Sequence, residues 1–237
     1  DRSRRFTLRL PGSTSNLGPG LDCVGLALNI YSTMSFFVLD ENDPGIPLIT
    51  FKGSIAKSSL AQEQGNLTYT ILSKLWQRDH DLLQRVRIIV DSEIPLGVGL
   101  GSSATAILGA LWAASVLKDR IPSAPSLLAE ASLLEGHPET LAACLLGNMV
   151  VSSPSSYSVS KNIVTQRLNW PKEWHLLVVS PQFSLTTANA RAVLPAQVKM
   201  EDAIFNVQKV ASLVAAVARR DESAFKDALD DRLHEPY

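Results

Sequence analysis

The segment of residues 95–106, PLGVGLGSSATA, is a glycine-rich turn that runs through two serines into an apolar stretch of helical length. Gly97, Gly99 and Gly101 permit positive φ values and let the backbone approach a ligand closely, because glycine carries no Cβ. Amide groups in such a turn converge on an anion, and the following helix adds its unpaired N–H groups and positive dipole end. The segment therefore predicts phosphate binding and nucleotide-dependent chemistry.

This turn differs from a Walker loop, since Ser102 and Ser103 follow its glycines where Gly-Lys-Ser would stand. It contains no lysine, so other groups must neutralise the charge of a bound phosphate. A plain tight loop that caps a helix is the alternative interpretation of a glycine and serine run. The flanking sequence favours the anion site over this alternative.

The flanks of the turn have the patterns of a strand and a buried helix. Residues 85–90, RVRIIV, alternate with Val86, Ile88 and Val90 on one face, as in a strand. Residues 104–117 have almost no polar face, which predicts a helix that is buried rather than amphipathic. A buried helix whose N-terminus meets a glycine turn is a good anion site.

Composition bounds the class of protein. The chain has 237 residues, of which 46% are hydrophobic and 19% charged, so we expect a soluble globular protein of two compact units. A formal net charge of −1 and scattered basic residues predict neither nucleic-acid nor membrane binding. Cys23 and Cys144 are too few for a disulfide scaffold or a zinc cluster. With no secretory signal and no long apolar run, we expect a cytoplasmic protein.

Periodicity and turn residues predict further elements in the first unit. A second loop rich in Gly, Pro, Ser and Asn covers residues 11–22. Around it we expect a strand at 6–10, paired strands at 26–39, and helices at 66–76 and 127–134. Gly136 and Pro138 should stop the last of these helices.

The second unit is predicted to begin after residue 170. Residues 152–160 have the composition of a linker or of a surface hairpin turn, and residues 174–179, WHLLVV, indicate a buried strand. Residues 201–219 predict an amphipathic helix that buries Ile204, Val207, Leu213, Val214 and Val217. These elements cannot close a layered core alone, so we expect the natural protein to continue beyond Tyr237.

Five separated segments resemble the GHMP small-molecule kinases and, among these, the homoserine kinases, most closely in their fungal form. They are STSNLGPGLDCVGLAL at 13–28, PLGVGLGSSATA at 95–106, EGHPET at 135–140, SLTTANARAVLP at 184–195 and DRLHEPY at 231–237. The resemblance implies an α+β two-layer GHMP kinase fold. It comprises an N-terminal nucleotide-binding α/β domain over 1–170 and an incomplete C-terminal α+β domain over 171–237. A homodimer is the partner state implied for the family.

The same resemblance implies an amino-acid site. Asn16 and Asp22 would hold the substrate, with Asp22 suited to its α-ammonium group. Arg191, in a segment that is a strand in the family, would grip the α-carboxylate, because a guanidinium pairs with a carboxylate through two charge-assisted hydrogen bonds. His137 would lie beside them. With Arg191 and His137, Thr140 completes the residues expected to act in catalysis.

The resemblance also implies a site for MgATP, from which a phosphoryl group would pass to the side-chain hydroxyl of L-homoserine. Asn66 matches a position near the adenine, and Ser103 and Glu135 match positions that meet Mg²⁺, a cation that favours a few protein oxygens with phosphate oxygens. The residues expected to bind ATP are Asn66, Pro95, Gly97, Val98, Gly99, Leu100, Gly101, Ser102 and Ser103.

Each of these residues has a simpler alternative. Asn16 is also a common turn residue and Asp22 a common cap or surface ion-pair residue. His137 before Pro138 fits an exposed loop, and Arg191 fits a solvated charge on a strand. The residues alone leave these interpretations open.

Two departures from the family pattern define alternative functions. Glu139 and Thr140 stand where the family has Asp and Asn, the latter beside the reacting hydroxyl, and an arginine expected after Tyr237 is absent. They favour a kinase-like protein that binds ATP or an amino acid without turnover, or a kinase with another hydroxylated acceptor. A displacement of 1 Å in such a site lowers the rate by ~100-fold.

Overall fold

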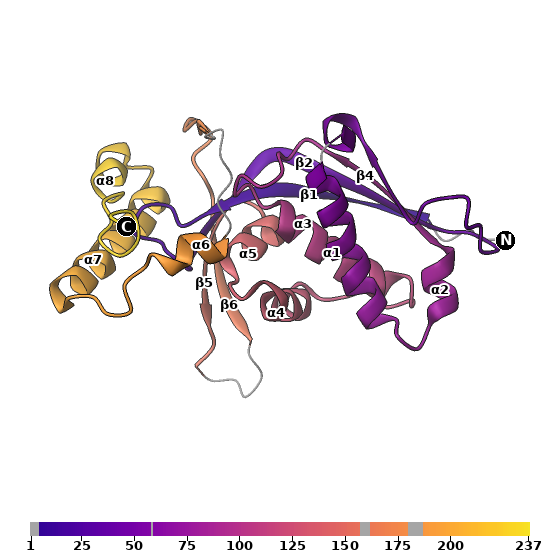
Figure 1. Ribbon diagram of the computed structural model, residues 1–237. Helices are drawn as coiled ribbons and strands as arrows, with labels where there is room; N and C mark the ends of the chain where they lie inside the picture. The colour runs from indigo at the N-terminus through magenta and orange to yellow at the C-terminus, as the bar shows by residue number, and fades with distance from the viewer. Residues whose placement is uncertain (1–4, 58, 157–161, 180–186) are drawn as a thin grey trace.

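The computed structural model describes residues 5–57, 59–156, 162–179 and 187–237 (Figure 1). Their strands form one sheet, in the order β3-β4-β2-β5-β6 with β1 paired to β2. The strands are β1 Arg5–Ser15, β2 Val24–Val38, β3 Ile49–Lys52, β4 Val86–Ser92, β5 Met149–Pro154 and β6 Ile163–Leu168. All pairs are antiparallel except β3 with β4.

β2 is the central strand of the sheet. Residues 25–37 pair with β1 along one edge, whereas on the other edge residues 32–38 pair with β4 and residues 24–26 with β5. The prediction of paired strands at 26–39 is therefore wrong, because this stretch is one continuous strand. The strand continues through Asn29 and Ser32 because β1 pairs along nearly its whole length. The strand predicted at 6–10 is confirmed within β1.

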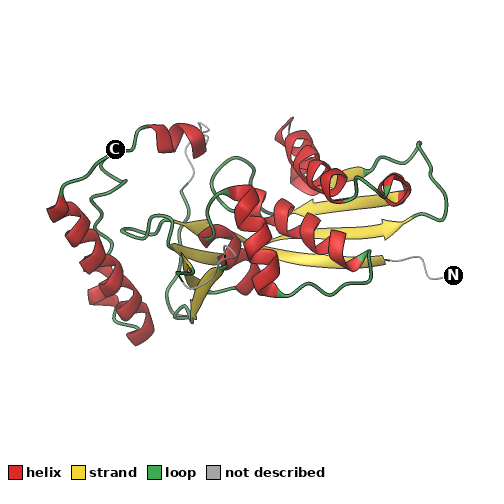
Figure 2. Ribbon diagram, turned by 90° about the horizontal axis from the view of Figure 1, so that it is seen from below, coloured by secondary structure: helices red, strands yellow, loops and turns green. Residues whose placement is uncertain are grey.

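The helices of the first part of the chain cover one face of the sheet (Figures 1 and 2). The helices are α1 Ser59–Leu75, α2 His80–Arg85, α3 Ser102–Val116, α4 Ala124–Glu135 and α5 Glu139–Leu146, after a 3-10 turn at Gly53–Lys57. The main core lies between them and the strands and includes Phe36, Trp76, Ile88 and Leu108. Among the described residues no helix is both long and apolar enough to cross a lipid bilayer.

The strand, turn and buried helix predicted around residues 85–117 are confirmed as β4, the turn and α3. Val86, Ile88 and Val90 are buried, and ten residues of α3 are buried as well. Gly109 allows this close packing, since a Cβ there would collide with the sulfur of Met34 on β2. The helix therefore lies directly on the central strand, with its N-terminus at the glycine turn.

The hairpin interpretation of residues 152–160 is confirmed as far as the structure describes it. β5 and β6 pair antiparallel from Met149↔Leu168 to Pro154↔Ile163, and the amide of Ser155 donates to the carbonyl oxygen of Asn162. Residues 157–161 lie outside the described part of the chain. The described serines of this run thus lie on β5 and at the end of its pairing with β6.

The C-terminal part contains α6 Thr187–Ala192, α7 Met200–Arg219 and α8 Glu222–Asp227. α7 and α8 lie at one end of the sheet, and a second core joins Leu213, Val217 and Ala228 to Val24 and Met149 of β2 and β5 (Figure 1). This core explains why a helix of mixed composition is ordered here.

Two predictions for the C-terminal part are wrong. Ile204 and Val207 of α7 are 50% and 66% exposed, so the buried side of the helix is narrower than its apolar pattern indicates. Residues 174–179 form no strand, and Leu177 and Val179 are 90% and 82% exposed. An apolar run becomes a strand only where another strand supplies hydrogen bonds, and none within the described residues pairs with it.

Candidate active site

The turn between β4 and α3 has the backbone conformation that its glycines predict. Gly97, Gly99 and Gly101 have φ values of 72°, 73° and 77°. Gly101 is the N-cap of α3 in the left-handed conformation, so the N–H groups of the first helical turn point toward this helix end. Because α3 has 15 residues, its positive dipole end adds to the attraction for an anion.

Two glycines of this turn have different surroundings. A Cβ on Gly101 would collide with the side chain and backbone of Ser13 in β1, and the amide of Ser13 donates to the carbonyl oxygen of Leu100 over 3.1 Å. A Cβ on Gly99 would meet no atom within 4 Å. Gly101 therefore fixes the turn to the sheet, whereas Gly99 presents its backbone to open space in which a phosphate can approach.

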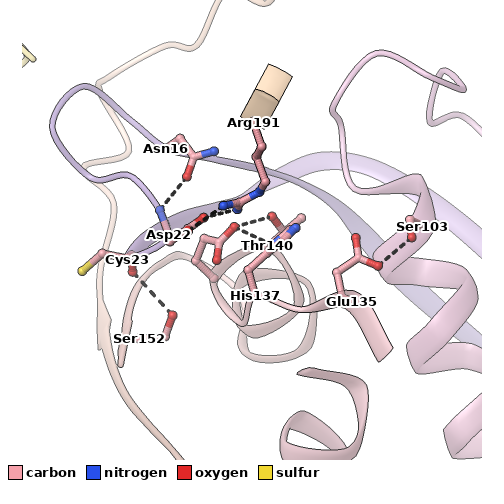
Figure 3. Close-up of polar contacts among 10 residues, drawn as sticks. Asn16, Asp22, Cys23, Ser103, Glu135, His137, Thr140, Ser152 and Arg191 are labelled. Carbon is pink, nitrogen blue, oxygen red and sulfur yellow. Dashed lines mark hydrogen bonds and ion pairs between the residues drawn. The ribbon is translucent and has the colours of Figure 1, made fainter. Parts of the chain in front are cut away.

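Two oxygen-bearing side chains lie close together at the same helix end. The Ser103 hydroxyl donates to Oε2 of Glu135 over 2.9 Å, although the two residues are 32 positions apart (Figure 3). Glu135 is the last residue of α4, which ends at Gly136 with a φ value of 92° as predicted. A hydroxyl and a carboxylate side by side are a donor set that suits Mg²⁺, which takes few protein oxygens and completes its shell with phosphate and water. The predicted ligand pair is thus brought together.

The loop between β1 and β2 holds Asn16 and Asp22 in a conformation that is uncommon for residues with a side chain. Their φ values are 61° and 54°, and Oδ1 of Asn16 accepts from the amide of Asp22 over 2.8 Å. Asn and Asp tolerate positive φ better than other residues, and such conformations persist where the surroundings fix them. Asn16 therefore acts on the loop itself, because it holds Asp22 in place.

Arg191 contacts the carboxylate of Asp22 with both terminal nitrogens (Figure 3). Its Nη1 donates to Oδ2 over 3.0 Å, and Nη2 donates to Oδ1. The prediction that Arg191 lies on a strand is wrong, because residues 187–192 form the short helix α6. The run of Ala and Asn in this segment has no β-branched residue after Thr187, which favours a helix. Residues 184–186 lie outside the described part of the chain.

A buried carboxylate that sequence reasoning did not place in the site, Glu139, lies beside this ion pair. It is the first residue of α5 and its side chain is fully buried. Its Oε1 lies 3.0 Å from Nδ1 of His137 and accepts from the Thr140 hydroxyl over 3.2 Å. Its Oε2 has no hydrogen-bond partner among the described residues. A cluster of an acid, an imidazole and a hydroxyl thus begins α5.

The packing of α5 on β2 fixes this cluster in space. A Cβ on Gly25 would collide with the backbone carbonyl of Glu139, so only glycine lets the N-terminus of α5 lie against the central strand. Gly25 is part of the 13–28 motif, but its contact with the backbone of Glu139 is visible only in the structure. This close approach of α5 to β2 also buries the Glu139 side chain.

Charges of the two halves of the site act on each other. The contact with Glu139 raises the pKa of His137 above its ordinary value of 6.5, burial lowers it, and the charges of Glu135 and Arg191 raise and lower it respectively. Burial raises the pKa of Glu139, but His137 and a backbone N–H outweigh it, so the net pKa lies below the ordinary value. Glu139 is therefore ionised at neutral pH. Glu135 and Arg191 both act on the pKa of His137, so the helix end at Ser103 and the Arg191–Asp22 pair are coupled electrostatically.

The structure places the remaining predicted residues as follows. Pro95, Val98 and Leu100 belong to the glycine turn, and Leu100 is buried against Leu28 and Ile94. Asn66 lies in α1, and its side chain falls outside what the structure describes, so its expected contact with adenine stays a prediction.

Comparison with known proteins agrees with this arrangement. Residues 66–148 match the family of GHMP kinases N terminal domain. The homoserine kinase of Solibacter usitatus is 38% identical over 98% of this chain and 73% of its own length, and that of Synechocystis sp. is 34% identical over 98% and 74%. The crystal structure of homoserine kinase from Cytophaga hutchinsonii has a TM-score of 0.72 at 22% identity, over 100% of this chain and 74% of its own.

The sheet covered by helices on one face, with a glycine turn at the N-terminus of a buried helix, defines a small-molecule kinase of the GHMP class. The two homoserine kinases are 38% and 34% identical to this chain over about three quarters of their own length, and this similarity identifies the family within the class. The chain belongs to the homoserine kinase family.

Proposed function

We propose that this protein transfers the γ-phosphoryl group of ATP to the side-chain hydroxyl of L-homoserine and forms O-phospho-L-homoserine. The observation that carries the proposal is the juxtaposition of two charge arrangements, the Arg191–Asp22 pair and the Ser103–Glu135 pair at the α3 N-terminus. The Arg191–Asp22 pair suits an α-amino acid, and the Ser103–Glu135 pair suits a nucleoside triphosphate with its cation. Membership of the homoserine kinase family supports the same substrates.

The Arg191–Asp22 pair matches the two charges of a zwitterion. The guanidinium of Arg191 donates two hydrogen bonds to the carboxylate of Asp22. An α-amino acid that enters between them exchanges this one ion pair for two, with its carboxylate on Arg191 and its ammonium on Asp22. His137 lies within electrostatic range of Arg191 and borders the same site. The pair therefore favours amino acids over uncharged alcohols, which offer no charge to either side chain.

The phosphates of ATP would lie against the glycine turn, with Gly99 at the open side and the amides of Ser102 and Ser103 at the helix end. Ser103 and Glu135 would hold Mg²⁺, and when bound this cation neutralises charge on the phosphates and favours the phosphoryl transfer. The backbone N–H groups of the turn stabilise the negative charge of the transition state without reorganisation.

Thr140 would contact the hydroxyl that receives the phosphoryl group. It lies next to Glu139 and is part of the cluster that begins α5. The depressed pKa of Glu139 makes it a weak base, so the hydroxyl proton passes to an oxygen of the transferred phosphoryl group rather than to this carboxylate. Thr140 stands where the family pattern has Asn, and both side chains can form a hydrogen bond at this position.

An ADP-release assay tests the proposed function. Purified protein with MgATP is given L-homoserine, L-serine or mevalonate, and we expect turnover above background with L-homoserine. Glu135→Gln should lose this turnover, whereas Glu130→Gln, an exposed residue of the same helix, should keep it. ATP binding without turnover for any acceptor would instead establish a non-catalytic sensor, and a preference for mevalonate would establish another acceptor.

Other features stay predictions. We place a domain boundary after residue 170 and expect a homodimer in the cytoplasm, similarity to the fungal enzymes, and an arginine that follows Tyr237 in the natural protein. Light scattering in solution and the location of a tagged protein check the dimer and the compartment. None of the substrate assignments above depends on these features.

A further inference from the structure

Glu139 is a charged side chain without contact to solvent. Its side-chain exposure is 0%, and it is the first residue of α5, held there by the close approach of α5 to Gly25. A buried carboxylate is unfavourable unless hydrogen bonds or opposite charges compensate it. Since compensation within the cluster comes from His137 and Thr140, these contacts constrain all three side chains together.

The contact with Glu139 decides the hydrogen-bonding direction of Thr140. A threonine hydroxyl has a single proton to donate and two lone pairs that accept. The Thr140 hydroxyl donates its proton to Oε1 of Glu139 over 3.2 Å, and an ionised carboxylate can only accept. The Thr140 oxygen therefore has no proton left for another partner, and only its lone pairs remain.

We propose that Glu139 is a positioning residue that makes the Thr140 hydroxyl an obligate hydrogen-bond acceptor for the hydroxyl of the amino-acid substrate. The inference rests on the proposed function, in which Thr140 meets this hydroxyl. A substrate hydroxyl that donates to Thr140 has its proton directed toward α5. Its lone pairs are then free to attack phosphorus on the other side while the bond from phosphorus to the ADP oxygen breaks, which is the geometry that phosphoryl transfer requires. The proton passes to an oxygen of the transferred phosphoryl group once the new bond has formed.

The alternative hydrogen-bond direction would lower the rate. Without an acceptor at residue 139, the Thr140 proton can turn toward the substrate and occupy a lone pair of the attacking oxygen. The substrate would still bind through Asp22 and Arg191, which do not contact Thr140 in any hydrogen bond of the structure's described residues. We therefore expect that removal of the acceptor at residue 139 lowers kcat and hardly changes the binding of the α-amino and α-carboxylate groups.

A double-mutant cycle tests the inference. Thr140→Val removes the hydroxyl at similar volume, and Glu139→Met removes the acceptor at similar length. Each should lower kcat with homoserine by roughly 10-fold or more. If Glu139 acts through Thr140, the double variant should be no slower than Thr140→Val alone. An equal further loss in the double variant would overturn the proposal.

Two further measurements separate positioning from a charge or folding effect. Glu139→Gln keeps a carbonyl acceptor without charge, so it should retain kcat within about 3-fold; a loss equal to that of Thr140→Val would contradict the acceptor role. L-2-aminobutyrate lacks the reacting hydroxyl, and its inhibition constant should stay unchanged in all variants. A parallel weakening of this inhibitor would show a distorted site instead and would overturn the proposal.

The controls keep these outcomes distinct from failure of the proposed function. Glu130→Met, on the exposed side of α4, should leave kcat unchanged. If Glu139→Met does not fold, as judged by circular dichroism, the comparison of Glu139→Gln with Thr140→Val decides alone. If the unsubstituted protein shows no homoserine-dependent ADP release, the proposed function fails. If it does turn over, and the losses of kcat from Glu139→Met and Thr140→Val add in the double variant, only the role of Glu139 fails.

Discussion

At the scale of single residues, the Arg191–Asp22 pair joins two positions 169 residues apart. The two side chains are 40% and 41% exposed, and ion pairs with this much solvent contact contribute little to stability. Its bidentate geometry is therefore better explained by binding than by folding. The resemblance to a family indicated both residues, but it assigned them to different groups of the substrate and did not predict that they would pair.

Replacement of Arg191 tests this interpretation. Arg191→Lys should raise KM for homoserine by roughly 10- to 100-fold, since an ammonium cannot form the two parallel hydrogen bonds of a guanidinium. Arg120→Lys, at an exposed position after α3, is the control and should change neither KM nor stability. The measurement is steady-state ADP release, with thermal unfolding of each variant. An unchanged KM in Arg191→Lys would remove the carboxylate role.

At the scale of elements, the glycine turn shows how a local sequence fixes a local structure. Positive φ values at three alternate glycines were foreseeable, because only glycine adopts them without strain. Which glycine faces the ligand was not foreseeable, since it depends on β1, a strand more than 80 residues earlier in the chain. Ser13 blocks the space at Gly101 and leaves that at Gly99 open.

Alanine substitutions distinguish these roles. Gly99→Ala should lower stability by about 1–2 kcal/mol, the strain of a left-handed residue, and should weaken MgATP binding by roughly 10-fold or more, since its Cβ enters the approach of the phosphates. Gly147→Ala is a control for backbone strain away from the turn, with φ and ψ values of 72° and 170° and no atom within 4 Å of the added Cβ. It should lose stability but keep ATP affinity in a titration. Equal affinities in both variants would contradict the phosphate site.

The segment after α8 is held by one carboxylate, Asp231. Its side chain is fully buried, its Oδ1 accepts from Asn206 of α7, and its Oδ2 accepts from the amides of Leu233, His234 and Glu235. Burial raises the pKa of Asp231, but these hydrogen bonds outweigh it and hold the pKa below its ordinary value of 3.8. This explains the DRLHEPY segment as a turn that closes on its own aspartate.

The pH dependence of stability follows from the sign of this shift. A depressed pKa contributes stability that is present above pH 3.8 and is lost as the pH falls through the folded-state pKa. Asp231→Asn should therefore lower the free energy of unfolding by about 1–3 kcal/mol at pH 7, and the difference from wild type should shrink at pH 3. Urea unfolding of both proteins at pH 7 and pH 3 measures this difference in the free energy of unfolding. A difference that grows at low pH would contradict the assignment.

At the scale of the whole molecule, the two largest cores share the central strand. The larger lies between the sheet and the helices α1 to α5, and the smaller joins α7 and α8 to β2 and β5. The apolar pattern of α7 predicted the helix correctly but placed Ile204 and Val207 in its core. Only the half of α7 that meets the sheet is buried, because burial depends on which surface the helix contacts.

Two substitutions on α7 measure this difference. Leu213 is fully buried, so Leu213→Ala should lower the free energy of unfolding by about 2–5 kcal/mol. Val207 is 66% exposed, so Val207→Ala should change it by less than about 0.5 kcal/mol. Chemical unfolding of both variants gives the comparison. Equal losses would mean that Val207 is covered in solution by something that the described residues do not include.

The sequence by itself determined the features that depend on short-range chemistry. These are the glycine turn, the buried helix that follows it, the end of α4 at Gly136 and the residue types of the site. The tertiary structure alone decided the burial of Glu139, the exposure of residues 175–179 and the pairing of Arg191 with Asp22. The physical reason is that conformational preferences act over a few residues, whereas burial and charge pairing arise from contacts between segments far apart in the chain.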